Sequence, residues 1–193
     1  MQNIPALSSP DTNLGSLRDI LFVPVSGVDK IKAPVDGEME YDALQFATES
    51  AVLFKLEFTR ETSEYTYDEV KTANGSIFKT KIMCMVPKEY KFRSADFTEM
   101  QNQKFFVITR DNNAKSRLHG YINLVGEKYG MTFSVDFGSG KSTTNYNGYK
   151  AEFYMESIYR PGVMEDITET PIDPGFPYDP GDVGVGPIDP GTG

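Results

Sequence analysis

The 193-residue chain has no tryptophan, one histidine and one cysteine, and each scarcity excludes something. With Cys84 alone, no disulfide can form within the chain, and Cys84 with His119 cannot complete a zinc site of cysteine and histidine ligands. Paired carboxylates are available for sugar hydrolysis, but no tryptophan can form a sugar-binding platform. His119 fits an ordinary strand position better than a catalytic triad, since no nucleophile-elbow pattern accompanies it. We therefore expect no catalytic residue, no metal ligand and no cofactor.

Long apolar stretches and excess positive charge are also missing. No stretch approaches the roughly 20 apolar residues of a membrane-spanning helix. Residues 1–15 lack the basic start and apolar core of a secretory signal. The net charge of −9 argues against general nucleic-acid binding. We expect no membrane span and no specific nucleic-acid recognition.

Basic residues are absent after Arg160, whereas seven acidic residues follow it. Residues 171–193 contain six prolines and six glycines, and the sequence PIDPG occurs twice, at 171–175 and 187–191. No apolar core can form from this composition. The sequence therefore predicts a folded domain over 1–164 and an acidic Pro/Gly-rich segment over 165–193.

Two interpretations of the C-terminal segment stay open: a disordered acidic tail, or an extended arm held by a neighbouring subunit. We expect the arm; ordering each backbone residue costs about 1–2 kcal/mol, and since the segment cannot easily recover that cost on its own domain, an ordered form of it requires support from a neighbouring subunit. Phe176 and Tyr178 are its largest apolar groups and should be the anchors. The expected subunit-contact residues are Pro171, Ile172, Phe176, Tyr178, Val183, Val185 and Ile188.

Eleven tyrosines and thirteen phenylalanines favour β-structure. Alternating apolar and polar residues predict strands over 19–25, 51–60, 63–72, 76–86, 104–111, 117–125, 131–137 and 149–157. Helical segments are fewer: one is expected after a Ser94 N-cap, over 95–103, and a short one is possible over 40–48. The charges expected on a solvated or intersubunit sheet face are Lys55, Glu57, Lys79, Lys81, Glu152 and Glu156. The fold class is mainly β (α+β), an antiparallel β-sandwich or barrel-like domain with one or two short helices.

The stretch FGSGKST (137–143) is similar to the end of a phosphate-binding P-loop. A P-loop requires a glycine where this chain has Val135, and it requires a helix immediately after the Lys-Ser pair. Asn147-Gly148 instead predicts a turn, and the residues after it alternate as in a strand. We therefore expect a polar hairpin loop that binds no nucleotide.

Residues 92–162 resemble small virion proteins of tailed bacteriophages, in particular those that infect Bacteroidetes hosts. The resemblance lies in KFFVITRDNNAKSRLHGYINL, in a strand ending in DFGSGKST, and in NYNGYKAEFYMES. It implies a neck or tail component, most specifically a tail-tube type β-sandwich that forms stacked rings. It implies no catalytic residues, and it assigns the GKST letters to a variable loop.

The resulting expectation is a non-enzymatic structural subunit of the virion, assembled in the host cytoplasm. Its expected partners are further copies in a ring, for which six is one candidate number, and neighbouring virion proteins. A carbohydrate- or receptor-binding β-module is the alternative, with a concave aromatic site formed from Tyr146, Tyr149 or Tyr154. A P-loop or hydrolytic enzyme is the third and weakest hypothesis.

Overall fold

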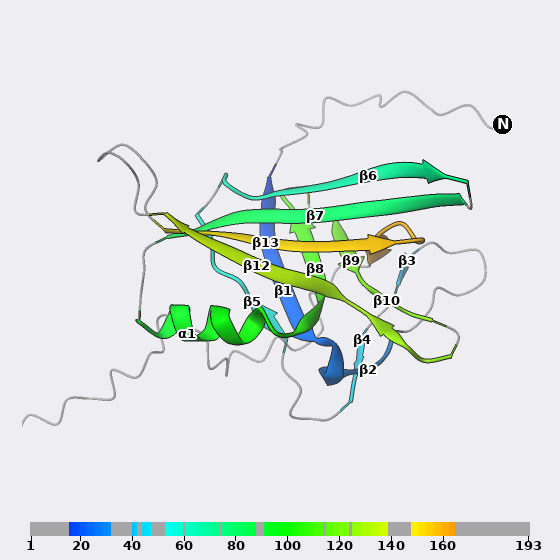
Figure 1. Ribbon diagram of the computed structural model, residues 1–193, viewed down its shortest axis with the longest axis horizontal. Coiled ribbons are helices and arrows are strands. Elements are labelled where there is room, and N and C mark those ends of the chain that lie inside the picture. The colour runs from blue at the N-terminus through cyan, green and yellow to red at the C-terminus, as the bar shows by residue number, and fades with distance from the viewer. Residues whose placement is uncertain are drawn as a thin grey trace, which may run out of the picture.

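The computed structural model describes residues 16–31, 40–41, 44–47, 53–59, 61–73, 75–87, 91–113, 115–123, 125–138 and 148–164. Within them the chain is a mainly antiparallel β fold with a single α-helix, as the sequence predicts (Figure 1). The expected arm residues, from Pro171 to Ile188, lie outside the described residues, so the boundary after residue 164 stays a prediction.

Most strands belong to one large sheet. Its elements are β1 (Leu17–Pro24), β3 (Glu40–Tyr41), β5 (Phe54–Lys55), β6 (Glu64–Thr72), β7 (Gly75–Pro87), β8 (Lys104–Asp111), β9 (Ser116–His119), β12 (Met131–Gly138), β13 (Gly148–Ser157) and β14 (Gly162–Met164). The smaller elements are the 3-10 turn η1 (Val25–Gly27), β2 (Val28–Ile31), β4 (Leu44–Phe46), α1 (Lys91–Met100), β10 (Tyr121–Ile122) and β11 (Lys128–Tyr129).

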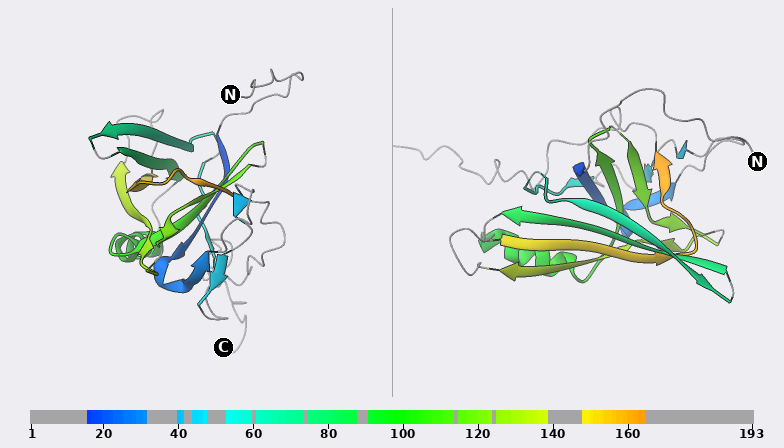
Figure 2. Two further views of the ribbon diagram at one scale, coloured as in Figure 1. Left: turned by 90° about the vertical axis from the view of Figure 1, so that its right-hand side faces the viewer. Right: turned by 90° about the horizontal axis from the view of Figure 1, so that it is seen from above.

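The large sheet folds into two layers. Strands β12, β13, β7 and β6 lie side by side in that order and form a layer of long strands. Strands β5, β1, β8, β9, β14 and β3 form the second layer, which joins the first only where two residue pairs link β8 to β12. Figure 1 shows β1 and β8 running across the long strands, and Figure 2 shows the two layers from other sides. The described strands do not close into a barrel.

Strand β8 is the centre of the molecule because it is buried on both faces. Phe105 and Val107 point into the core between the layers, whereas Phe106 and Ile108 point into a second core on the far side. A strand covered on both faces needs a continuous apolar run, and the sequence FFVI provides it. β8 pairs with β1 along one edge and with β9 along the other.

The core between the layers depends on alternation along the long strands. Phe153 of β13 is fully buried and contacts Phe22 of β1 in the opposite layer, with ring centroids 5.8 Å apart. Ile82 and Cys84 of β7 point inward beside it. The strands predicted over 76–86, 104–111, 131–137 and 149–157 are therefore confirmed.

Two predicted elements are wrong. Residues 40–48, expected as a possible short helix, contain β3 and β4 instead. Of the strand expected over 51–60, the described residues 53–59 form only the two-residue strand β5. The reason is that this segment crosses between the layers: the Leu56 amide donates to the Ile20 carbonyl of one layer, and the Thr59 amide donates to the Met85 carbonyl of the other. Leu53 and Leu56 are both buried, so the period-two alternation does not continue.

The expected helix and the strand over 117–125 need smaller corrections. Helix α1 begins at Lys91, so Ser94 lies inside it and is not an N-cap. The packing of Phe97, described below, holds the helix where the local cap signal does not. The strand is divided into β9 and β10 at Gly120, whose φ of +118° strongly favours glycine.

Candidate functional site

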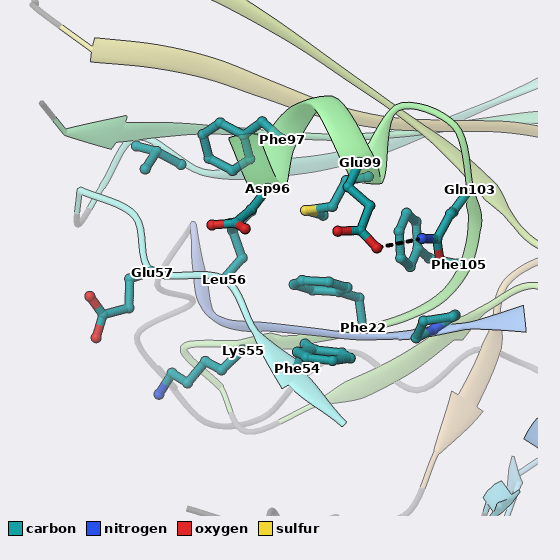
Figure 3. A pocket seen from close by; sticks show the side chains of 13 residues that line it. Phe22, Phe54, Lys55, Leu56, Glu57, Asp96, Phe97, Glu99, Gln103 and Phe105 are labelled. Carbon is teal, nitrogen blue, oxygen red and sulfur yellow. Dashed lines mark hydrogen bonds between the residues drawn. The ribbon is translucent and has the colours of Figure 1, made fainter. Parts of the chain in front are cut away.

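An open cavity of about 390 Å³ lies between α1, the end of β1 and the segment 54–57 (Figure 3). Its lining is mostly apolar and includes the rings of Phe22, Phe54, Phe97 and Phe105. We call this cavity the aromatic groove. Its volume falls in the range of about 300–1,000 Å³ that is typical of binding pockets.

The floor of the aromatic groove is a set of phenylalanine rings that contact one another. Phe22 is stacked against Phe54 with centroids 5.5 Å apart, and it meets Phe105 edge-on at 5.4 Å. Phe22 and Phe105 are buried, and the pairing of Pro24 with Phe105 fixes their strands in register. The floor is therefore preformed by the β1–β8 pairing.

One wall of the groove is α1, and among the side chains described on this helix Phe97 is the most deeply buried. Phe97 is 4% exposed and packs against Phe133 at 5.6 Å and against Tyr149 at 5.0 Å. Met100, one turn further along, is only partly buried and lines the groove. The helix thus holds to the long strands through Phe97 while a gap remains between it and β5.

The rim of the groove is polar and mainly acidic. The Lys55 ammonium lies 2.8 Å from an oxygen of Asp19, so an acidic partner already neutralises it. Glu57, Asp96 and Glu99 also line the groove (Figure 3). Lys55 and Glu57, expected on a solvated sheet face, therefore lie at the mouth of the groove. Such a site can bury apolar groups while disfavouring anionic ones.

The residues that could supply reactive groups lie elsewhere and are buried. Desolvation raises the pKa of the Cys84 thiol to about 12, so the thiolate needed for nucleophilic chemistry does not form near neutral pH. Among the described residues, no three His, Cys, Asp or Glu side chains come together where they could hold a metal ion.

His119 lies on β9 and is fully buried, as expected of a strand side chain. Its Nε2 lies 2.8 Å from the Thr109 hydroxyl, and its ring contacts that of Tyr65 at 4.8 Å. Burial, with a smaller contribution from the Arg117 charge, lowers its pKa to about 3. The imidazole is therefore neutral and inaccessible to a substrate.

The P-loop-like letters join two antiparallel strands. Residues 139–147, which include Lys141, lie outside the described residues, but β12 ends at Gly138 and β13 begins at Gly148. Gly138 and Gly148 pair directly across the hairpin. The next described element after this stretch is the strand β13, whereas a phosphate-binding loop leads into a helix.

The aromatic residues proposed for carbohydrate binding do not form one site. Tyr146 lies outside the described part of the chain, Tyr149 is buried against Phe97, and Tyr154 projects from the opposite face of β13. A different set comes together. Tyr129 stacks on Tyr121 at 4.7 Å, and Tyr159 meets Tyr121 edge-on at 5.0 Å. No spacing in the sequence signals this set, because three separate segments supply it.

The outer face of the long-stranded layer carries paired charges, as the sequence predicts. Lys79 lies 3.2 Å from Glu156, and Lys81 lies 2.7 Å from Glu152. A hydrogen bond from Tyr154 and then the Lys79 ammonium hold the pKa of Glu156 below its usual value. These pairs are solvent-exposed, so each contributes little to stability.

Both edges of this layer have open stretches. β6 pairs with β7 along its whole length and with no other described strand. On the opposite edge, β12 pairs with β8 only at Met131 and Thr132, so its remaining residues have a described partner strand, β13, on one side only. Tyr67 and Val70 of β6 are 44% and 39% exposed.

Comparisons with protein-family models, with curated proteins and with solved structures gave no match. No helix in the described part of the chain is long and apolar enough to cross a membrane.

Proposed function

We propose that this chain is a non-enzymatic structural subunit of a tailed-phage particle, a tail-tube or neck protein that assembles into homo-oligomeric rings. The observation that carries the proposal is the layer β12-β13-β7-β6, which has an open stretch on each edge among the described strands. Exposed strand edges pair with other chains unless they are covered or blunted. β6 is nine residues long, well above the short strands that usually blunt an edge.

The order of strands suits pairing between copies. Each strand of this layer is antiparallel to the next, so β12 and β6 run in opposite directions. When copies are placed side by side, β6 of one copy lies antiparallel to β12 of the next, and the hydrogen-bond pattern continues across the boundary. Because the two edges differ, the contact is head-to-tail, and such contacts generate rings when the rotation closes.

The resemblance to phage virion proteins supports the same conclusion from the sequence. The stretch concerned, 92–162, contains most of α1 and the strands from β8 to β13. It includes β12, which provides one of the two open edges. In this proposal the subunit works in the virion, next to other virion proteins, and neither substrate nor cofactor takes part.

A matched pair of variants tests the edge contact. Val70→Lys places a charge on the β6 edge, where we expect ring formation to weaken by about fivefold or more, because a lysine at an edge disfavours pairing. Val125→Lys makes the same change at the 81% exposed tip of the β10–β11 hairpin, away from both edges, and should leave assembly unchanged. Sedimentation velocity over a concentration series measures both. Equal assembly of the two variants would count against the edge contact.

One observation favours a second candidate, a carbohydrate- or receptor-binding module. The Tyr121, Tyr129 and Tyr159 set is partly exposed, with Tyr159 at 55%. Glycan-array binding that Tyr159→Ala abolishes without changing assembly would support this function instead.

A further inference from the structure

The aromatic groove is a large, mostly apolar cavity in the described part of the chain. We propose that it receives the C-terminal segment of a neighbouring copy, with Phe176-Pro177-Tyr178 seated against its phenylalanine floor. This inference rests on the proposed homo-oligomer and deepens it, because it names the surface of a neighbouring copy that binds the C-terminal arm.

The first argument is chemical. Grooves lined by aromatic side chains bind proline-rich segments, because such segments are already extended in the polyproline conformation and lose little entropy on docking. The groove contributes four phenylalanine rings and Pro24. Residues 174–178, PGFPY, form an uncharged stretch between Asp173 and Asp179 and contain the two aromatic residues of the segment.

The second argument is geometric. β14 ends at Met164, which pairs with Ser116, and Ser116 in turn pairs with Arg110 near the end of β8. The groove lies at the other end of β8, beside Phe105. The segment therefore leaves the domain far from its own groove. In a head-to-tail assembly, the exit of one copy and the groove of the next can face each other.

The reach of the segment is sufficient for this contact. In polyproline backbone, at about 3.1 Å per residue, the chain from Met164 to Phe176 spans roughly 37 Å. The longest strand, β7, spans about 43 Å at about 3.3 Å per residue. The reach exceeds the length of β8, about 26 Å at about 3.3 Å per residue, so the arm is long enough to extend past the end of its own copy, and the isotope-mixed crosslinks below distinguish a neighbour's groove from its own.

Charge makes the proposal specific. Glu57, Asp96 and Glu99 at the rim and Asp173 and Asp179 beside the anchor have the same sign. Docking must then be driven by apolar contact, and screening by salt should strengthen it. A basic partner protein in the groove would show the reverse dependence and would lose affinity as salt increases.

Photo-crosslinking of the full chain tests the contact. Phe176 is replaced by benzoylphenylalanine, and chains of natural isotope composition are mixed with nitrogen-15 chains before assembly and irradiation. We expect crosslinks from position 176 to residues 53–57 or 96–105, in peptides that combine the two isotopes. Their yield should increase as sodium chloride rises from about 50 mM to about 500 mM. Benzoylphenylalanine at Val125, an exposed position outside the groove, should give no groove crosslinks.

Two variants strengthen the test. Met100→Glu adds a further carboxylate within the groove and should lower the groove crosslink yield at least fivefold. Tyr178→Ser, which leaves the described domain unchanged, should lower it as well. Crosslinks that join only chains of the same isotope, or that map outside the groove, would overturn the proposal.

Electron micrographs of the same samples distinguish a failure of the proposed ring assembly from a failure of the proposed arm contact. Rings without groove crosslinks would refute only the inference that the arm binds in the groove. The absence of any oligomer would refute the proposed function, and with it the inference. A groove crosslink yield that falls as salt rises would contradict the apolar driving force argued here, because it would show that attraction between opposite charges holds the arm in the groove.

Discussion

His119 shows how a single residue links packing to pH. It is the only histidine of the chain and is held neutral in the core, with its pKa lowered to about 3 mainly by desolvation. In the unfolded chain the pKa of a histidine is about 6.5. The folded-state pKa is therefore the lower of the two. Below about pH 6.5, His119 binds a proton in the unfolded chain but stays neutral in the folded chain. Lowering the pH therefore lowers the free energy of unfolding.

The expected change in the free energy of unfolding is a loss of about 2 kcal/mol between pH 7 and pH 5 from this residue alone. His119→Gln replaces a fully buried ring, so its free energy of unfolding should be lower at pH 7. Because glutamine cannot titrate, this free energy should change less on acidification. Urea denaturation of both proteins at the two pH values measures the difference. The same pH dependence in both would show that His119 is not the source.

Gly120 is the position where backbone conformation and packing together exclude any other residue. Its φ is +118°, and a Cβ would lie 2.4 Å from the Phe106 ring and 2.9 Å from the Tyr129 carbonyl oxygen. Gly120→Ala should lower the free energy of unfolding by about 2–4 kcal/mol, from backbone strain and overpacking combined.

Gly126 provides the matched control for this substitution. It also has a positive φ, +85°, but nothing lies within 4 Å of its Cβ position. Gly126→Ala should therefore cost only the backbone strain, about 1 kcal/mol. Equal losses for the two variants in chemical denaturation would contradict the packing argument.

At the scale of elements, the sequence predicts strands well where a strand has one buried face. β7, β12 and β13 alternate because the long-stranded layer faces the core on one side and solvent on the other. The strand prediction from the sequence fails at 51–60, where the apolar pattern is regular but the chain crosses between the layers. The break between β9 and β10 at Gly120 is not predicted either, because the close approach of the Phe106 ring to this glycine is a tertiary contact that no local motif signals.

The aromatic groove could not have been predicted. Phe22, Phe54, Phe97 and Phe105 come from four separate elements, and only the tertiary arrangement brings them together. Each residue alone is typical of a core position. The alternating charges at Lys79, Lys81, Glu152 and Glu156, by contrast, could be assigned to one face from spacing alone.

Among the side chains described on α1, Phe97 makes the most deeply buried contacts. Its ring is buried against Phe133 and Tyr149, whereas Asp96 and Met100 are only partly buried and Glu99 is exposed. Phe97→Ala should lower the free energy of unfolding by about 3–5 kcal/mol, the usual cost of removing a buried phenylalanine. Met100→Ala, at the groove, should cost clearly less.

Hydrogen exchange separates the helix from the whole domain. Amides 97–103 should lose protection first in Phe97→Ala, while β8 and β13 keep theirs. Unchanged protection of α1 in this variant would show that other contacts hold the helix.

At the scale of the whole molecule, the decisive feature is the pair of open edges of the long-stranded layer. Among the described strands, β6 and most of β12 each have a partner strand on one side only, so a monomer leaves these stretches of the long-stranded layer's edges open. In the proposed ring, closure would remove both open edges at once, because each β6 would meet the β12 of the next copy. The acidic arm then has a neighbour to bind.

The most direct test is electron cryomicroscopy of the purified full-length protein over a range of concentrations. The account predicts closed rings, in which β6 of each subunit lies antiparallel to β12 of the next, as one continuous sheet. Only monomers at every concentration, or rings whose contacts leave both edges in solvent, would contradict it.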